Sequence, residues 1–317
     1  MCTAASYKGI FGRNLDYDFG YGQKILITPR NFPLSFNHAP RLNNHYAIIG
    51  SGIIEKEYPM YFDAINEKGL GIAGLNFVGN CVYHEAIDGK TNIAQYELIP
   101  YILSTCANVK EVKELYKNLN IDNEVVSDRY SPAQLHWFIA DKESSIVLET
   151  VKDGLKLYDN PVNVLTNNPP FNMQLFNLNN YAHLSKKDPV NSFGIELTRY
   201  SRGMGAMGLP GDLSSMSRFV KVAFTNHFSE SLNDDHLNQF FHILHSVEQQ
   251  NGCCEVKDRS YEYTIYSSAC DLDKGIYYYT TYTNHQISGV NMHHENLDDS
   301  SLIEYPMLEE ETIKMQN

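Results

Sequence analysis

Met1-Cys2-Thr3-Ala4-Ala5-Ser6-Tyr7-Lys8-Gly9-Ile10-Phe11-Gly12-Arg13-Asn14-Leu15-Asp16 opens the chain, and this stretch decides the fold. Two runs of apolar and β-prone residues, Cys2–Tyr7 and Ile10–Leu15, stand on either side of a short turn at Lys8-Gly9. We therefore predict a β-hairpin that brings Arg13 and Asp16 back beside Cys2.

The two charged residues of the second run lie three positions apart. Side chains alternate between the faces of a strand, so Arg13 and Leu15 share one face while Asn14 and Asp16 share the other. Both charges can meet Cys2 only if the strand bends or ends there. The alternative is a surface ion pair on an ordinary hairpin.

Cys2 is a candidate nucleophile because removal of Met1 would make it the N-terminal residue. An α-amino group titrates near ~7.7–8.0 and can take the thiol proton, directly or through water. A nearby arginine stabilises a thiolate by charge, and a nearby aspartate orients the amine. The alternative is a small buried hydrophobic residue at the start of a strand.

Composition excludes several classes of protein. Apolar residues make up 43% of the 317 residues and charged residues 20%, which is typical of a folded globular chain. With 38 acidic and 25 basic residues the net charge is -13, which repels nucleic acids and anionic membranes. We therefore expect neither as a partner, and an anionic ligand would need a local cationic patch.

Six cysteines are too few for a disulfide scaffold and indicate thiols in a reducing compartment. The first residues lack the basic region of a signal peptide, and no apolar run is long enough to span a membrane. We expect a cytoplasmic location. His242 and His245 lack the carboxylate of a zinc motif, so we expect no metal and no other cofactor.

The order of predicted elements indicates an α+β fold in which sheets pack between helices. After the hairpin, strands are expected at Lys24–Thr28, Tyr46–Ile54 and Leu70–Phe77. Helices within Ile93–Leu119 are expected to start at Asn92 and Asn108, with Glu111 in a capping-box position. Strands are expected to resume at Leu135–Ala140, Ile146–Thr150, Leu155–Tyr158 and Val162–Thr166. Two helices follow at Ser214–His227 and Asp235–Val247, and the last strands are expected at Tyr261–Ser268, Gly275–Tyr282 and Gln286–Met292. Without a repeat or linker, we predict a single domain over residues 1–317, with Met1 removed.

Eight short strings occur in the order found in a known family. They are Met-Cys-Thr, Phe11-Gly-Arg-Asn-x-Asp16, Asn66-Glu-Lys-Gly-Leu-Gly71, Gly74-Leu-Asn-Phe77, Leu135-His-Trp137, Leu165-Thr-Asn167, Gly208-Leu-Pro-Gly-Asp212 and Ser217-Arg-Phe219. End to end, the chain resembles the choloylglycine hydrolases, and within them the bile salt hydrolases. The resemblance implies a four-layer αββα N-terminal-nucleophile sandwich, a homotetramer, and hydrolysis of amide bonds in glycine- or taurine-conjugated bile acids or in penicillin V.

The resemblance also assigns roles residue by residue. The residues that match the family's catalytic positions are Cys2, Arg13, Asp16, Asn76, Asn167 and Arg218. Those expected to touch substrate are Cys2, Arg13, Leu15, Phe62, Asn76 and Arg202. The Asn167 amide and a backbone N–H near Asn76 would supply the two donors that a tetrahedral oxyanion needs. Taken alone, Asn167 is a turn former and Asn76 a strand-end cap.

The segment between Cys2 and Phe11 is a few residues shorter than expected for the family. We therefore expect a shortened hairpin turn that flanks the mouth of the site and alters the shape of its pocket.

Substrate preference is indicated at two places. Asn76 resembles the bile salt hydrolases, whereas penicillin V acylases more often have an aromatic residue there. The expected apolar wall for a steroid comprises Leu15, Tyr17, Phe19, Met60 and Phe62. The Ser201-Arg202-Gly203 form of the loop resembles the taurine-preferring members, and a guanidinium can hold a sulfonate. The alternatives are a penicillin V acylase or another N-acyl amidase, and a non-catalytic steroid- or lipid-binding protein.

Overall fold

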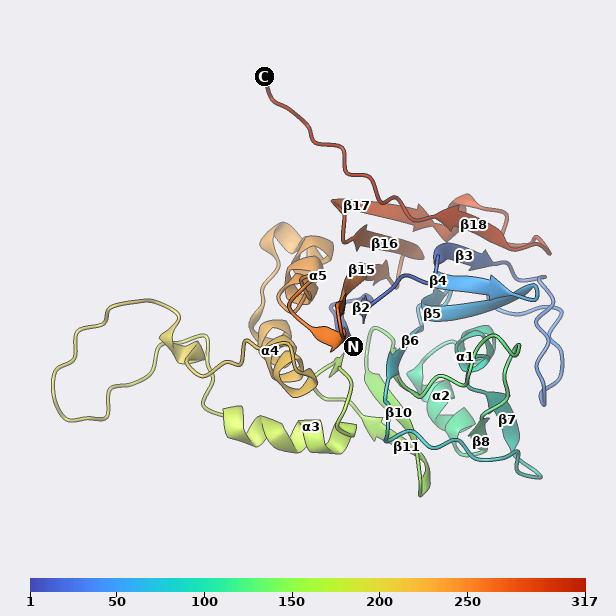
Figure 1. Cartoon of the computed structure of the whole chain (residues 1–317), viewed down its shortest axis with the longest axis horizontal. Coiled ribbons are helices and arrows are strands. Elements are labelled where there is room, and N and C mark those ends of the chain that lie inside the picture. Colours follow the sequence, from blue (N-terminus) through green and yellow to red (C-terminus); the bar gives the residue numbers. More distant parts are fainter.

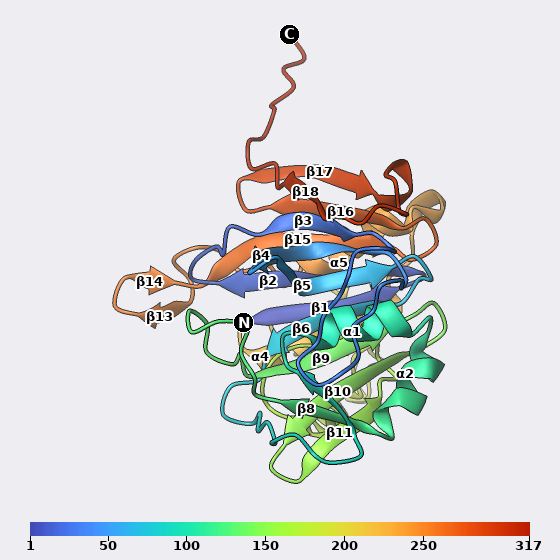
Figure 2. The ribbon, with the colours of Figure 1, turned by 90° about the vertical axis from the view of Figure 1, so that its right-hand side faces the viewer.

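The computed structural model describes residues 1–317, and two β-sheets face each other between two layers of helices (Figures 1 and 2). The six-stranded sheet has the order β12 (Val164–Leu165), β1 (Cys2–Tyr7), β2 (Ile10–Tyr17), β15 (Tyr263–Asp271), β16 (Ile276–Thr281) and β17 (Asn284–Asn291). The eight-stranded sheet has the order β11 (Gly154–Asp159), β10 (Ser145–Val151), β9 (Leu135–Ala140), β6 (Gly71–Asn76), β5 (Tyr58–Asn66), β4 (Ile48–Glu55), β3 (Lys24–Thr28) and β18 (Ile303–Pro306).

Helices cover the outer face of each sheet (Figure 1). On the side of the six-stranded sheet lie α3 (Phe171–Asn177), α4 (Ser215–Phe228) and α5 (His236–His245), and on the other side lie α1 (Leu98–Thr105) and α2 (Val109–Tyr116). Two small ladders complete the structure, β13 (Glu255–Lys257) with β14 (Ser260–Tyr261) and β7 (Thr91–Ala94) with β8 (Leu119–Asp122). The predicted α+β sandwich of four layers is confirmed.

Close contact at β2 explains part of the Phe-Gly-Arg string. The Phe11 ring stacks on Phe138 of the opposite sheet, with centroids 5.7 Å apart and planes 6° from parallel. Next to Phe11, a Cβ on Gly12 would collide with the backbone carbonyl of Ser268 on β15. Only glycine lets the two strands pair this closely, so this string fixes both the sheet pairing and the contact between sheets.

The predicted β1–β2 hairpin forms, with Cys2 opposite Leu15 and Ala4 opposite Arg13. Lys8 and Gly9 make the turn with φ angles of 47° and 83°. Two consecutive positive φ values are those of a type I′ turn, whose twist matches the strands.

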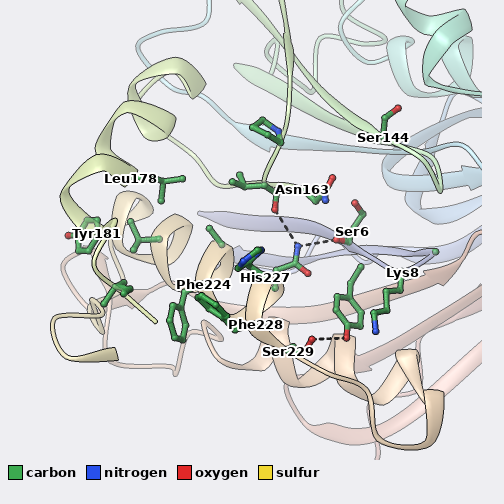
Figure 3. A pocket seen from close by; sticks show the side chains of 18 of the residues that line it. Ser6, Lys8, Ser144, Asn163, Leu178, Tyr181, Phe224, His227, Phe228 and Ser229 are labelled. Carbon is green, nitrogen blue, oxygen red and sulfur yellow. Dashed lines mark hydrogen bonds between the residues drawn. The ribbon is translucent and has the colours of Figure 1, made fainter. Parts of the chain in front are cut away.

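The expectation that this turn flanks the mouth of the Cys2 site is wrong. Cys2 is the first residue of β1 and the turn follows its last, so Cys2 and Lys8 lie roughly 20 Å apart at about 3.3 Å per residue. The turn instead lines a separate cavity of about 580 Å³, together with the end of α4 (Figure 3). Ser6 and Lys8 line that cavity from β1 and the turn, and Phe224 and Phe228 line it from α4. The Tyr7 hydroxyl donates to the Ser229 carbonyl at 3.2 Å.

Of the two helix starts predicted at Asn92 and Asn108, only the second is confirmed. At Asn108 the side chain accepts the Glu111 N–H at 3.0 Å, and the Glu111 carboxylate accepts the Ala107 N–H at 2.7 Å, which confirms this cap. The predicted helix start at Asn92 is wrong, because this residue lies in β7 and pairs in parallel with Asn120. Strand β5 and helix α3 had no counterpart among the predicted elements.

Residues 186–203 form a long loop, here called the arm, that projects from the body (Figure 1, far left). Its large apolar side chains are exposed, and they are Val190, Phe193, Ile195, Leu197 and Tyr200. None of the helices in the structure is long and apolar enough to cross a bilayer.

Candidate active site

Cys2 lines a cavity of about 200 Å³ whose walls are mostly apolar. Its side chain is only 3% exposed. Four of the five residues predicted to form an apolar wall line this cavity, namely Leu15, Tyr17, Met60 and Phe62. Phe19 lies outside it, half exposed and packed on Tyr17, because it follows the end of β2.

Arg13 projects from β2 into the same cavity and is almost completely buried. Strands β5 and β6 pair from Ile65 opposite Gly71 to Asp63 opposite Ala73. The Arg13 guanidinium lies just beyond this last pair. Arg13 Nη1 donates to the carbonyl oxygens of Phe62 at 3.1 Å and Gly74 at 2.5 Å. The cation is thus held by backbone between two strands, facing Cys2.

The electrostatic surroundings keep Arg13 charged. Burial acts to lower its pKa, but Cys2, Tyr266, Asp63 and Asp16 together raise the pKa of Arg13 above its ordinary value. A guanidinium that cannot lose its proton is a permanent partner for a developing thiolate.

Asp16 lies on the opposite face of the six-stranded sheet and is fully buried. It accepts the Thr264 hydroxyl at 2.6 Å and the Gln249 amide at 3.3 Å. Arg218 Nη1 is 3.9 Å from its carboxylate. Burial raises the pKa of Asp16, against the opposing effect of Arg218.

Arg218 extends from α4 to Cys2 from that same face. Its Nη1 donates to the Cys2 carbonyl at 2.6 Å and to the Thr3 hydroxyl at 2.5 Å, and its Nη2 donates to Asn167 Oδ1 at 2.9 Å. Burial lowers the pKa of Arg218, while Asp16 and Cys2 counteract it. The two arginines therefore approach Cys2 from opposite faces of one sheet.

Arg13 and Asp16 lie near the first residues of β1, on opposite faces of the sheet. Arg13 shares the face of the Cys2 side chain, as the pairing of Ala4 with Arg13 requires. Asp16 accompanies the backbone end of Cys2, where the α-amine of a processed chain would stand. Neither strand ends there, because β2 continues to Tyr17 and Met1 pairs with Asp16. The irregularity is a register shift in β15 between Thr264 and Tyr266, opposite Asp16 and Leu15.

Asn167 and Asn76 meet beside Cys2. Asn167 Oδ1 accepts the Cys2 N–H at 2.7 Å, and its Nδ2 donates to the Asn76 carbonyl at 2.8 Å. The Asn167 backbone is fixed by Ser215 Oγ at 2.9 Å and by the Gln174 amide at 2.5 Å. One hydrogen on Nδ2 remains for a further acceptor.

The backbone N–H of Asn76 is directed away from β9. Phe77 N–H donates to the Gln134 carbonyl at 2.7 Å, which makes that pair a hydrogen-bonded one. Pair types alternate along an antiparallel ladder, so the adjoining Asn76–Leu135 pair is not hydrogen-bonded. The Asn76 N–H therefore points toward β5, the side on which Arg13 binds Gly74.

The structure retains Met1, which continues the ladder one residue beyond Cys2. Its ammonium group donates to the Asp16 carbonyl at 2.8 Å and forms an ion pair with Glu262. Burial lowers the pKa of this amine. Glu262 is 6% exposed and also lines a second cavity of about 320 Å³, which Asn76 and Asn167 share.

Sequence reasoning missed four residues of this site: Gln249, Thr264 and Glu262, which surround Asp16 and the N-terminus, and His136, which lies behind the asparagines. No local signal marks the first three. The fourth, His136, belongs to the Leu135-His-Trp137 string that matches the family, and this string could have marked it. Arg202, by contrast, is exposed on the arm and lines neither cavity at Cys2. Nowhere do three or more histidine, cysteine, aspartate or glutamate side chains gather closely enough to hold a metal ion.

The four-layer sandwich, with a buried cysteine at residue 2 and this hydrogen-bonded surround, defines an N-terminal-nucleophile hydrolase fold. The chain belongs to the linear amide C–N hydrolases of the choloylglycine hydrolase family, whose model matches residues 1–305.

Individual relatives agree with this assignment. A bile salt hydrolase/transferase of Lactiplantibacillus plantarum is 55% identical, with 98% of each chain covered. A bile salt hydrolase/transferase of Clostridium perfringens is 39% identical, with 96% of each covered. The crystal structure of a C2A mutant of conjugated bile acid hydrolase from Clostridium perfringens superposes with a TM-score of 0.93 at 38% identity, covering both chains fully. Penicillin V acylase from Agrobacterium tumefaciens shares the fold, with a TM-score of 0.74 at 20% identity over 96% of this chain and 90% of that one.

Proposed function

We propose that this hydrolase cleaves the amide bond of glycine- or taurine-conjugated bile acids with Cys2 as its nucleophile. One observation carries the proposal: Cys2, Arg13 and Asn76 line one mostly apolar cavity, and Asn167 binds both the Cys2 N–H and the Asn76 carbonyl. An apolar acyl group fits the cavity, and a scissile carbonyl then meets the thiol. The names of the relatives support bile salts as the substrate class.

The reaction begins once Met1 has been removed. The free α-amine of Cys2 takes the thiol proton, and Arg13 stabilises the thiolate. The sulfur attacks the amide carbon, and the oxyanion that forms accepts hydrogen bonds from Asn167 Nδ2 and the Asn76 N–H. The α-ammonium returns its proton to the nitrogen as the C–N bond breaks, and the glycine or taurine leaves.

A water molecule then attacks the thioester carbon and gives its proton to the α-amine. The C–S bond breaks, the thiolate recovers its proton, and the free bile acid departs. Asp16 and Arg218 do not touch the reacting atoms in this sequence. Arg218 fixes the backbone of Cys2 and the orientation of Asn167, and Asp16 lies 3.9 Å from Arg218 as its buried counter-charge.

The cavity also limits how a steroid binds. Its volume of about 200 Å³ is below the roughly 300–1,000 Å³ typical of ligand sites. Residues 125–133, which include Val125, Val126 and Tyr130 on the wall, form the loop that closes it. A whole steroid therefore requires this loop to move outward or one ring to remain outside.

Two finer statements belong to the same proposal. The exposed apolar arm supports a homotetramer, because side chains such as Phe193 and Val190 need cover. The second statement, a preference for taurine conjugates, rests on the Ser201-Arg202-Gly203 sequence. Since Arg202 lies outside the Cys2 cavities of its own chain, it can hold a sulfonate only through a movement of the arm or from a neighbouring copy.

We further propose that residues 2–317 act as one domain in the cytoplasm. The two core clusters that span the sheets support the first point, and six free thiols support the second.

Hydrolysis assays with glycocholate, taurocholate and penicillin V test the proposed substrate class. We expect both bile salts to be cleaved faster than penicillin V. Faster cleavage of penicillin V would make the chain an acylase of another substrate class, and no cleavage of any amide would favour a binding protein. Intact mass of the same sample must show the loss of one methionine.

A further inference from the structure

His136 is a fully buried residue of β9 that touches the neighbours of both asparagines at the site. Its ring stacks on Phe77, which follows Asn76, with centroids 4.4 Å apart and planes 6° from parallel. Its Nε2 lies 2.7 Å from the carbonyl oxygen of Thr166, which precedes Asn167. One imidazole ring thus contacts the two segments that carry the oxyanion donors.

Glu149 supports this ring from the next strand. It stands directly opposite His136 in the β9–β10 ladder, is fully buried, and places Oε1 3.1 Å from His136 Nδ1. The same oxygen accepts the Phe171 N–H at 2.9 Å. The pair therefore also links β9 to the start of α3, just beyond Asn167.

Hydrogen-bond chemistry fixes the orientation of the ring. A backbone carbonyl only accepts, so Nε2 must carry a hydrogen toward Thr166. Nδ1 faces a carboxylate, so one further proton is shared between His136 and Glu149. With both nitrogens engaged and one face on Phe77, the ring has one arrangement that satisfies all its partners.

We propose that His136, held by Glu149, is a positioning residue that sets the spacing between the Asn76 N–H and Asn167 Nδ2. It touches no substrate, and it acts through Phe77 and Thr166. This inference rests on the proposed role of the two asparagines as oxyanion donors. Misplacement of a catalytic donor by about 1 Å can cost on the order of 10²-fold in rate.

The test compares His136→Phe with a matched control. Phenylalanine keeps a flat ring against Phe77 but cannot donate to Thr166. His45 is an equally suitable control, because it is buried, and its two ring nitrogens lie 2.8 Å from the backbone carbonyls of Tyr46 and Phe32, away from Cys2. We expect His136→Phe to lower kcat for taurocholate by roughly 10–100-fold with KM unchanged. His45→Phe should lower the melting temperature without changing kcat.

A double-mutant cycle separates positioning from general damage. If His136 acts through Asn167, the loss caused by His136→Phe should shrink to a few-fold when Asn167 is already alanine. Full additivity would overturn the inference, as would an unchanged kcat in the single variant. Glu149→Gln serves where His136→Phe does not fold, since it keeps the shape and should show the same fall in kcat at constant KM.

The wild-type enzyme decides which proposal has failed. Absence of amide hydrolysis by processed wild-type protein refutes the proposed function. A wild-type enzyme that cleaves taurocholate, together with a His136→Phe variant of equal kcat, refutes only the positioning role. All rates are divided by the concentration of reactive Cys2 thiol, so that loss of folded protein cannot imitate loss of kcat.

Discussion

The surroundings of Cys2 and the arm at residues 186–203 are built in opposite ways. Around Cys2, Arg13, Asp16 and Arg218 are at most 1% exposed, and each is held by several hydrogen bonds. On the arm, Phe193 and Val190 are 80% and 92% exposed. The sheet register holds the site residues within one chain, whereas the apolar side chains of the arm find no cover in their own chain.

The largest expected effect is at the nucleophile. Cys2→Ser should reduce kcat by more than about 10³-fold, because a hydroxyl ionises far less readily than a thiol. The melting temperature should stay near that of wild type, since the two side chains are similar in size. Hydrolysis of taurocholate by protein of verified N-terminus is the measurement. Near-normal turnover by a correctly processed variant would remove Cys2 from the mechanism.

Next is the donor at Asn167. Asn167→Ala should lower kcat by roughly 10²–10³-fold, as loss of an oxyanion donor does. Part of the loss comes from Arg218 and the Cys2 amine, which both bind Asn167 Oδ1. Asn168→Ala is the control, because its amide bonds only to the Val78 carbonyl. Equal activity of the two variants would contradict the assignment.

The arm should control assembly. Phe193→Asp places a charge on the exposed apolar surface, so we expect the mass in solution to fall toward that of one chain, 36.2 kDa. Activity at high dilution should change only a few-fold. Phe176→Asp on α3 is the control, since that ring is 76% exposed but lies outside the arm. Light scattering measures the mass in solution of both variants. A wild-type protein of single-chain mass would refute the homotetramer.

A smaller effect is expected at Arg202. Arg202→Ala should lower the ratio of kcat/KM for taurocholate to that for glycocholate by up to about fivefold, because an exposed charge contributes ~0–1 kcal/mol. Lys187→Ala, another exposed cation of the arm, should leave the ratio unchanged. An unchanged ratio in Arg202→Ala would show that the amino-acid moiety is recognised elsewhere.

The smallest effect concerns Asp212, between the arm and α4. Hydrogen bonds from Ser214 and Ser217 lower the pKa of Asp212 to about 2. A carboxyl with a depressed pKa stabilises the fold above its unfolded value near 4, and that contribution is lost as pH falls toward 2. Asp212→Asn should therefore lower the melting temperature by one or two degrees at most near pH 6, and less near pH 3. A difference that grows on acidification would contradict this sign.

Prediction from sequence succeeded where the cause is local. The Lys8-Gly9 turn and the Asn108–Glu111 cap each depend on residues a few positions apart, and both formed. The predicted helix start at Asn92 is wrong because this residue pairs with a strand 28 residues further along the chain. The turn was placed at the wrong end of the site because a hairpin carries its turn away from its first residue.

Within the site, the resemblance located residues that spacing alone left ambiguous. Arg218 follows Cys2 by more than 200 positions, and only the fold brings them to 2.6 Å. Gln249, Thr264 and Glu262 had no signal, because their contacts to Asp16 and the N-terminus depend on the pairing of β2 with β15. Residues that support a site from a distant strand require the structure.

Met1 completes the ladder and covers the backbone end of Cys2. A chain that keeps it folds around the same cavity but has no amine in place to accept the thiol proton. Under the proposed mechanism, the precursor that keeps Met1 is therefore inactive, and removal of Met1 activates it. A tag fused ahead of Cys2 should then give a folded protein without hydrolytic activity, whereas a tag at the exposed C-terminus should leave the amine free.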